Sequence, residues 1–349
     1  MNNQIFDFLN EYAKLPSPQY AVLLRGKWGC GKTYFVKHWL EEFDKSNKLP
    51  ANENSIELKP IYVSLFGMRE ISDIKSAIDR CVNPFFYSKA GKILKIAGRI
   101  ASKIIFKTEL DIDKDGKSET SFSGALDSLS IFENDNKDEV KGVKFIIFDD
   151  LERCQIPMKQ LLGFINYFVE HCDCHVVVVG EEKYLNDKTL HDLLEFKEKI
   201  VGREFEILPD IEAAIKLFVS EPMMATDFLS KETGMIQLCF ECTATLNLRL
   251  LRQSLLDFSS LISALPTKQV ENNHEYLRSL LSCYIAVYAE YRNIDNHDYI
   301  VAWGNCAVKA FVDTKDESQK IRNLMGKYNR VNSLNQFEAL SSEMVPKIV

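Results

Sequence analysis

The chain of 349 residues is long enough for two domains, and its hydrophobic content of 46% is ample for packed cores. Its net charge of −7 argues against a general polyanion binder, so any contact with nucleic acid or a membrane must come from a local patch. Nine cysteines without a recognisable export signal favour reduced thiols. No apolar run approaches the ~18 to 20 residues that span a bilayer, so we expect a soluble, cytoplasmic protein.

The first predicted elements surround a glycine-rich loop. Helical spacing of apolar residues over 5–12 precedes an apolar strand over 20–24, and a helix is expected over 34–40. Between strand and helix stands Gly26-Lys27-Trp28-Gly29-Cys30-Gly31-Lys32-Thr33, the G-x-x-x-x-G-K-T pattern of a Walker A phosphate-binding loop. Because strand, loop and helix follow in the order that phosphate binding requires, a chance glycine-rich turn is disfavoured.

The positions of the loop have expected roles in nucleotide binding. Its glycines let successive amide N–H groups converge on the β-phosphate, and the helix N-terminus adds unpaired donors. We expect Lys32 to place its ammonium group against the β- and γ-phosphates, and the Thr33 hydroxyl to ligate Mg²⁺. The predicted nucleotide-binding residues are Gly26, Lys27, Trp28, Gly29, Cys30, Gly31, Lys32, Thr33 and Tyr34.

A buried strand over 60–67 and a helix over 71–81 are expected next, followed by an insertion near 85–140. From 89 to 107 the insertion carries six cations, no acid, and apolar residues at three- and four-residue steps, the pattern of a basic amphipathic helix. We favour packing of its apolar stripe on the core or on a protein partner. Contact with an anionic membrane surface or with nucleic acid is the alternative.

Paired carboxylates end the next apolar strand, expected over 143–150. Its sequence Phe145-Ile146-Ile147-Phe148-Asp149-Asp150 is typical of the Walker B strand. Because parallel strands deliver their carboxyl-terminal residues to the site, we expect Asp149 to hold Mg²⁺, usually through water. Asp150 is expected to accept a proton from the attacking water or to orient it. Lys32 and Asp150 are thus predicted catalytic residues, and Thr33 and Asp149 predicted metal ligands.

A helix over 163–169 and strands over 175–180 and 203–208 complete the first half. Five strands separated by helical segments predict a parallel α/β sheet. After Pro209 the composition changes to helical stretches. We therefore predict a core domain over 1–209, which includes the insertion, and a helical domain over 210–349.

These motifs resemble those of the KAP-type P-loop NTPases, a family related to AAA+ and STAND ATPases. The resemblance covers about residues 1–265. Its matches are R-G-K-W-G-C-G-K-T at Arg25 to Thr33, S-L-F-G at Ser64 to Gly67, F-D-D-L-E-R-C at Phe148 to Cys154 and E-K-I-V-G at Glu198 to Gly202. It implies a central parallel sheet in the order 5-1-4-3-2, followed by an all-helical lid domain.

The same resemblance gives meaning to Asn247-Leu248-Arg249-Leu250-Leu251-Arg252, which is similar to a lid element whose arginine reaches towards the γ-phosphate. Arg249 is the first candidate, in a catalytic role, and Arg252 the second, as a nucleotide-binding residue. An arginine can fork onto phosphate oxygens and so sense whether the γ-phosphate is present. Two solvated arginines on an amphipathic helix are the alternative.

Two departures from the family pattern limit what the resemblance implies. Many members carry transmembrane helices between the two nucleotide motifs, where this chain has the basic segment. The family often has asparagine after the fourth strand, whereas this chain has Gly180-Glu181-Glu182. The family's way of positioning the attacking water, and its rate of hydrolysis, are therefore not transferred to this chain.

The expected function is that of a Mg²⁺-dependent ATPase that acts as a nucleotide-controlled conformational switch, with turnover that is slow or dependent on a partner. The resemblance suggests ATP and Mg²⁺ as cofactors, a homo-oligomer or a protein partner, and a role in bacterial defence against phage or mobile elements. Two alternatives stay open. One is a nucleotide-binding interaction module with little turnover. The other is a nucleic-acid-associated ATPase motor that uses 89–107 as its contact.

Overall fold

The computed structural model describes eight stretches of the chain: residues 2–46, 56–82, 140–222, 226–243, 245–264, 273–291, 326–328 and 330–331. The expected basic helix over 89–107 and most of the predicted insertion lie outside these residues. Two compact units make up the fold. The sheet-containing unit consists of Asn2–Gly26 and Lys32–Ile207, and the helical unit consists of Leu208–Val349 together with Lys27–Gly31.

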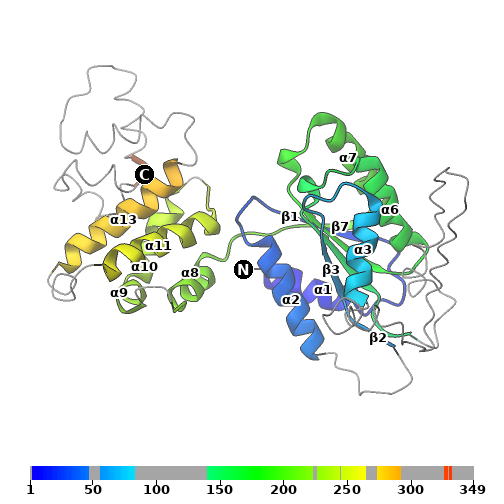
Figure 1. Ribbon diagram of the computed structural model, residues 1–349, viewed down its shortest axis with the longest axis horizontal. Coiled ribbons are helices and arrows are strands. Elements are labelled where there is room, and N and C mark those ends of the chain that lie inside the picture. Colours follow the sequence, from blue (N-terminus) through cyan, green and yellow to red (C-terminus); the bar gives the residue numbers. More distant parts are fainter. Residues whose placement is uncertain are drawn as a thin grey trace, which may run out of the picture. The chain divides into compact units, whose positions relative to one another are not determined.

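Five parallel strands form the central sheet of the sheet-containing unit, in the order β3-β5-β6-β1-β7 (Figure 1). They are β1 (Ala21–Arg25), β3 (Ile61–Ser64), β5 (Phe145–Asp149), β6 (His175–Gly180) and β7 (Val201–Glu206). Numbered among themselves along the chain, these strands read 2-3-4-1-5 across the sheet. This is the predicted order 5-1-4-3-2 seen from the opposite edge, so the predicted fold class is confirmed.

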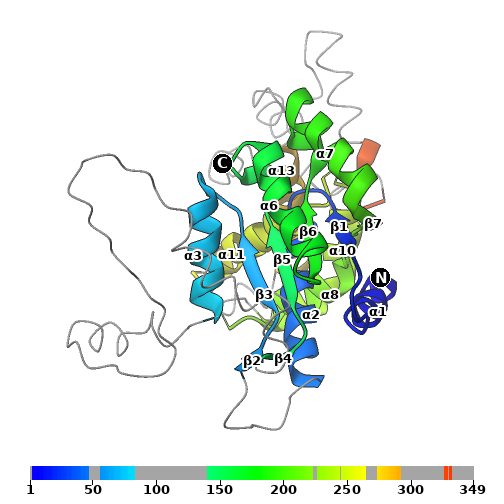
Figure 2. The same ribbon diagram turned by 90° about the vertical axis from the view of Figure 1, so that its right-hand side faces the viewer.

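Helices cover both faces of this sheet (Figures 1 and 2). On one face α3 (Ile71–Val82), α6 (Met158–Glu170) and α7 (Asp187–Ile200) pack against the strands in a continuous apolar cluster. On the other lie α1 (Asn3–Tyr12) and α2 (Lys32–Ser46). Every residue of β5 and β6 is buried, which explains why their sequences are continuous apolar runs rather than alternating patterns.

Aromatic side chains join α1 and α2 to the sheet. Trp39 of α2 lies 4.8 Å from the ring of Phe145 on β5, and Tyr12 of α1 meets the same ring edge-on at 5.9 Å. The Tyr12 hydroxyl donates a hydrogen bond to the carbonyl oxygen of Tyr20 at 2.7 Å and accepts one from the backbone N–H of Val176 at 3.0 Å. These contacts fix α1 beside the segment that enters β1.

The short strands β2 (Ile56–Leu58) and β4 (Val140–Gly142) form a separate parallel pair. The sequence analysis missed this pair because each segment is only three residues long and the two lie far apart in the sequence. Among the described residues, the other predicted elements are present and differ at their ends. The helix expected over 34–40 begins at Lys32 and continues to Ser46, and the last core strand begins at Val201 rather than at residue 203.

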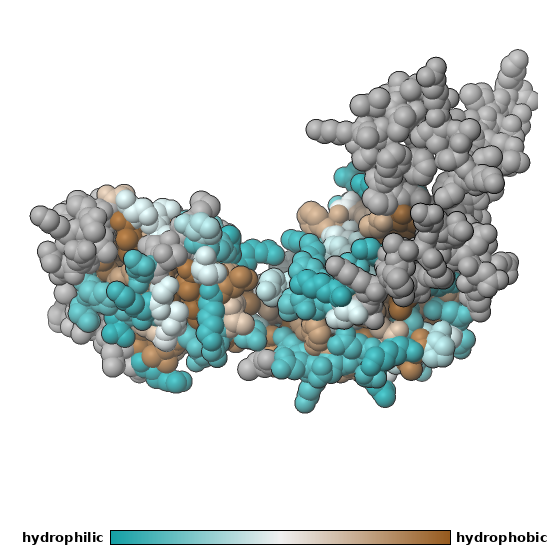
Figure 3. All heavy atoms as spheres, turned by 90° about the horizontal axis from the view of Figure 1, so that it is seen from below, coloured by the Kyte–Doolittle hydropathy of each residue, from teal (hydrophilic) through white to brown (hydrophobic). Residues whose placement is uncertain are grey.

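The described part of the helical unit consists of helices, as predicted. These are α8 (Ile211–Val219), α9 (Thr226–Lys231), α10 (Thr233–Glu241), α11 (Leu248–Ser263) and α13 (His274–Tyr291). They share one apolar core, in which Phe240, Phe258 and Leu281 are almost fully buried. On the face drawn in Figure 3, hydrophilic side chains are interspersed with hydrophobic ones over the described surface. Among the helices in the described ranges, none has the length and apolar character needed to cross a membrane.

Candidate functional site

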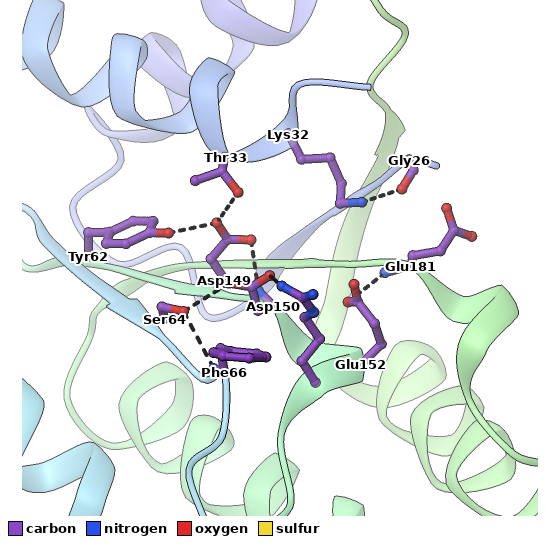
Figure 4. Close-up of polar contacts among 11 residues, drawn as sticks. Gly26, Lys32, Thr33, Tyr62, Ser64, Phe66, Asp149, Asp150, Glu152 and Glu181 are labelled. Carbon is purple, nitrogen blue, oxygen red and sulfur yellow. Dashed lines mark hydrogen bonds and ion pairs between the residues drawn. The ribbon is translucent and has the colours of Figure 1, made fainter. Parts of the chain in front are cut away.

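The glycine-rich loop connects the end of β1 at Arg25 to the first residue of α2 at Lys32. Gly29 and Gly31 have φ angles of 79° and 99°, in the left-handed region where a Cβ atom causes strain. The Lys32 ammonium donates a hydrogen bond to the carbonyl oxygen of Gly26 (Figure 4). Lys32 therefore lies folded over the beginning of its own loop.

Three further residues predicted to contact nucleotide differ in exposure. Trp28 is 42% exposed and Tyr34 is 61% exposed, whereas Cys30 is buried at 4%. The Tyr34 ring stacks on His38 one turn further along α2, with centroids 6.1 Å apart and planes 16° apart. Trp28 and Tyr34 thus keep ring surface exposed to solvent, while Cys30 is buried.

The predicted metal ligands meet beside the loop. The Thr33 hydroxyl donates a hydrogen bond of 2.8 Å to Oδ2 of Asp149, and the Tyr62 hydroxyl donates a second bond of 2.8 Å to the same oxygen (Figure 4). Asp149 is only 1% exposed. Burial raises the pKa of its carboxyl group, although the bonds from Tyr62 and Thr33 oppose the shift. A cation beside this carboxylate would offset the desolvation that raises its pKa.

Tyr62 remains a hydrogen-bond donor in this arrangement. Burial, followed by the nearby charge of Asp149, raises the pKa of its phenol well above the usual value of 10.0. The cation of Lys37 lies 4.9 Å from the centroid of the Tyr62 ring. The ring is therefore held from α2 on one side and by its hydroxyl at Asp149 on the other.

Asp150 points to different partners from Asp149. Its backbone is left-handed, with φ 61° and ψ 41°, where the chain leaves β5 for the short helix Leu151–Arg153. The Ser64 hydroxyl donates a hydrogen bond of 2.8 Å to Oδ2 of Asp150, and Nη1 of Arg153 lies 3.7 Å from its Oδ1. The turn after β5 therefore separates the two adjacent carboxylates and gives each its own set of contacts.

The segment after β6 lies beside the Walker B turn. The Glu181 N–H donates a hydrogen bond to Oε2 of Glu152 at 3.0 Å (Figure 4). Glu182 is paired with Lys197 at 2.8 Å, and Lys197 also pairs with Glu204 at 2.7 Å. The side chain of Glu182 is therefore engaged with Lys197 of α7, which also pairs with Glu204 of β7.

The two predicted lid arginines are on α11 in the helical unit. Arg249 is exposed, and its backbone N–H is capped by the side chain of Asn247 at 3.0 Å. Arg252 forms a two-pronged pair with Glu221, with distances of 2.8 and 2.6 Å. This pairing lowers the pKa of Glu221, mainly through the hydrogen bond from Arg252. Contact of either arginine with nucleotide stays a prediction.

Two residues of the site were missed by the sequence analysis, namely Tyr62 and Ser64. Both are on β3, where they alternate with buried Ile61 and Val63. This alternation was available in the sequence, but the pairing of Ser64 beside Asp149 comes from the register between β3 and β5. Without that register, nothing in the sequence links these hydroxyls to the paired carboxylates.

A protein-family model described as the KAP family P-loop domain matches residues 1–265. A search among curated proteins returns no match. The chain is similar to a solved structure of the ORC2 protein of Aeropyrum pernix in ADPNP and ADP complexes, with 12% identity, a TM-score of 0.43, and coverage of 99% of this chain and 90% of that one.

Two further solved structures show a similar degree of likeness. A Walker-type ATPase of Pyrococcus abyssi is 14% identical, with a TM-score of 0.39, and the match covers 94% of this chain and 89% of that one. A DNA polymerase III gamma subunit-related protein of Thermotoga maritima is 12% identical, with a TM-score of 0.30, and the match covers 98% of this chain and 96% of that one.

Proposed function

The chain belongs to the KAP family of P-loop NTPases, and from this premise we propose that it binds ATP with Mg²⁺, hydrolyses it, and changes conformation with the state of the nucleotide. The observation that carries the proposal is the 2.8 Å hydrogen bond from Thr33 to Asp149. It joins the last residue of the Walker A loop to the end of the Walker B strand, 116 positions apart. The two residues that would hold the metal are thus already adjacent.

The residues at this point fit Mg²⁺ chemically. Mg²⁺ takes oxygen ligands and is usually bound by one or two protein groups together with phosphate oxygens and water. The Thr33 hydroxyl and the buried Asp149 carboxylate supply oxygen donors of that kind. When bound, the ion would neutralise charge that develops on the phosphates. Lys32 would exchange its hydrogen bond with Gly26 for bonds to the β- and γ-phosphates.

Asp150 would orient the attacking water and receive its proton. Its contacts with Ser64 and Arg153 leave it separate from Asp149, as two different tasks require. The proposed switch would depend on Arg249 and Arg252, which would bind phosphate oxygens when the γ-phosphate is present. For Arg252 this step requires exchange of its pairing with Glu221.

The proposal extends to the protein's setting. A partner, either a second copy of the chain or another protein, would complete or control the site, since related NTPases use subunit contacts for this purpose. Cytoplasmic action in defence against phage or mobile elements is supported only by the family resemblance. The motor alternative depends on 89–107, which lies outside the described residues.

A second candidate function is a nucleotide-binding interaction module with little turnover. The observation that favours it is the engagement of Glu182 with Lys197, together with the use of the Glu181 N–H by Glu152. These contacts engage the carboxylate of Glu182 and the backbone N–H of Glu181 with other parts of the protein, which leaves them unavailable to position water.

Steady-state phosphate release separates the two candidates. We expect the parent protein to release phosphate from ATP only with Mg²⁺, and Asp150→Asn to bind ATP with unchanged affinity while turnover falls by about 10²-fold or more. Release from the parent at the level of Asp150→Asn, despite normal binding, would favour the interaction module. Hydrolysis by Asp150→Asn at the parent's rate would remove Asp150 from the mechanism.

A further inference from the structure

Two hydroxyl groups of one strand reach the two paired carboxylates separately. Tyr62 and Ser64 are two positions apart on β3, so their side chains project from the same face of the sheet. The Tyr62 hydroxyl donates to Oδ2 of Asp149, and the Ser64 hydroxyl donates to Oδ2 of Asp150, both at 2.8 Å (Figure 4). Side chains of one short strand thus donate hydrogen bonds to both acidic residues.

We infer that Tyr62 and Ser64 are positioning residues that assign the paired carboxylates to separate tasks, Tyr62 holding Asp149 for the metal and Ser64 holding Asp150 for the water. The inference rests on the proposed function of the site. It adds Tyr62, which none of the matched motifs contains, assigns a role to Ser64, the first residue of S-L-F-G, and gives each of them a different measurable role.

The hydrogen bonds at Asp149 leave its carboxylate little freedom. Oδ2 accepts from both Tyr62 and Thr33, and Oδ1 accepts from the backbone N–H of Asp150 at 2.8 Å. The plane of the carboxylate is therefore fixed at both oxygens, with Oδ2 turned towards Thr33. Loss of the Tyr62 hydroxyl would remove one of the two donors to Oδ2 and leave the bond from Thr33.

At Asp150 a separate set of contacts restrains the carboxylate. Oδ2 is held by Ser64 and Oδ1 faces Arg153, and the left-handed backbone turns the side chain away from that of Asp149. The Ser64 hydroxyl also lies 3.4 Å from the N–H of Phe66, which donates to it and orients its proton towards Asp150. Ser64 is thus itself held in the position of a donor.

Groups that orient a metal ligand or a catalytic base affect function more than folding. Removing the partner of a metal-ligating group typically lowers metal affinity by about 10- to 100-fold. Removal of a hydroxyl that only satisfies a buried carboxylate would instead lower the stability of the fold and leave the response to Mg²⁺ unchanged. Titration with Mg²⁺ therefore separates positioning from packing.

The experiment uses the full chain and a fluorescent ATP analogue. Its affinity is measured first in EDTA and then across a MgCl₂ titration, for the parent, Tyr62→Phe and Ser64→Ala. For Tyr62→Phe we expect the affinity in EDTA to match the parent, while the Mg²⁺ concentration for half-maximal tightening rises about tenfold. For Ser64→Ala we expect a Mg²⁺ titration curve like the parent's, with turnover about tenfold lower. This loss is smaller than the whole contribution of a general base, because Ser64 only orients Asp150.

Matched controls remove hydroxyls elsewhere in the same unit. Tyr12→Phe takes away a buried phenol hydroxyl that bonds to Tyr20 and Val176, and Ser76→Ala takes one from the exposed side of α3. We expect Tyr12→Phe to lower the melting temperature without shifting the Mg²⁺ curve, and Ser76→Ala to change neither. Ser64→Thr keeps a hydroxyl and should restore turnover.

Each result decides the inference. A Mg²⁺ curve for Tyr62→Phe that superimposes on the parent's overturns the role of Tyr62, and parental turnover in Ser64→Ala overturns that of Ser64. A shift of the Mg²⁺ curve by Tyr12→Phe as large as that by Tyr62→Phe would assign the effect to stability and overturn positioning. If the parent's affinity for ATP does not respond to Mg²⁺, the proposed function itself fails, a result distinct from the others.

Discussion

A methyl group added at Gly180 would test how closely the end of β6 approaches the Walker B turn. A Cβ atom built at this position lies 2.9 Å from Cβ of Leu151 and 3.3 Å from Oε2 of Glu152. Carbon atoms do not approach that closely, and Cβ of Leu151 is fixed to its backbone, so Gly180→Ala must displace the turn. Overpacking of this kind costs about 1 to 3 kcal/mol.

The matched control is Gly163→Ala on α6, where no atom lies within 4 Å of the added carbon. In an exposed helical position alanine is favoured over glycine by about 1 kcal/mol. For a unit of this size, 1 kcal/mol corresponds to roughly 2 to 4 °C. We therefore expect Gly180→Ala to lower the melting temperature by about 2 to 12 °C and Gly163→Ala to raise it by about 2 to 4 °C.

The melting temperatures are measured by circular dichroism without nucleotide, and phosphate release is measured on the same samples below the transition. Because Leu151 follows Asp150 directly, Gly180→Ala should also lower turnover, whereas Gly163→Ala should not. A melting temperature for Gly180→Ala equal to the parent's would show that the close contact between β6 and this turn is wrong.

Two further predictions concern single side chains. Trp28 is 42% exposed in the loop, so its emission should change when nucleotide covers it. In a chain that carries Trp303→Phe, Trp28→Phe should lose this change because the remaining Trp39 is fully buried; an equal change would contradict it. Burial lowers the pKa of His175 below its usual 6.5, against opposing hydrogen bonds from the backbone. A histidine whose pKa is lower in the folded than in the unfolded state contributes stability above the unfolded pKa, and this stability is lost as pH falls through the folded pKa. The melting temperature of the parent should therefore fall more between about pH 7 and about pH 5 than that of His175→Gln. Equal falls in the two proteins would refute this prediction.

The core of the site could be predicted from sequence because its motifs are local. A strand, a glycine-rich loop and a helix start identify Lys32 and Thr33, and an apolar strand that ends in two acids identifies Asp149 and Asp150. The rule that parallel strands deliver their carboxyl ends to one edge then brings these residues together. The 2.8 Å contact between Thr33 and Asp149 is the outcome of that rule.

Features that depend on register or on side-chain pairing could not be predicted in this way. The contribution of Tyr62 and Ser64 follows from how β3 pairs with β5, which alternation alone does not set. The pairing of β2 with β4 joins segments that lie far apart in sequence and are only three residues long each. The pair between Arg252 and Glu221 depends on the packing of helices, and sequence spacing gives no sign of it.

The central claim is that the loop ending in Lys32 and Thr33 binds ATP, and one titration tests it most directly. A fluorescent ATP analogue with Mg²⁺ is titrated into the parent, Lys32→Ala and the control Lys159→Ala, which removes an exposed lysine from α6. Loss of a charge-assisted hydrogen bond costs about 1.5 to 3 kcal/mol, so Lys32→Ala should bind about 10- to 100-fold more weakly than the parent, or not measurably, while Lys159→Ala should bind like the parent. Binding by Lys32→Ala with the parent's affinity would contradict the account.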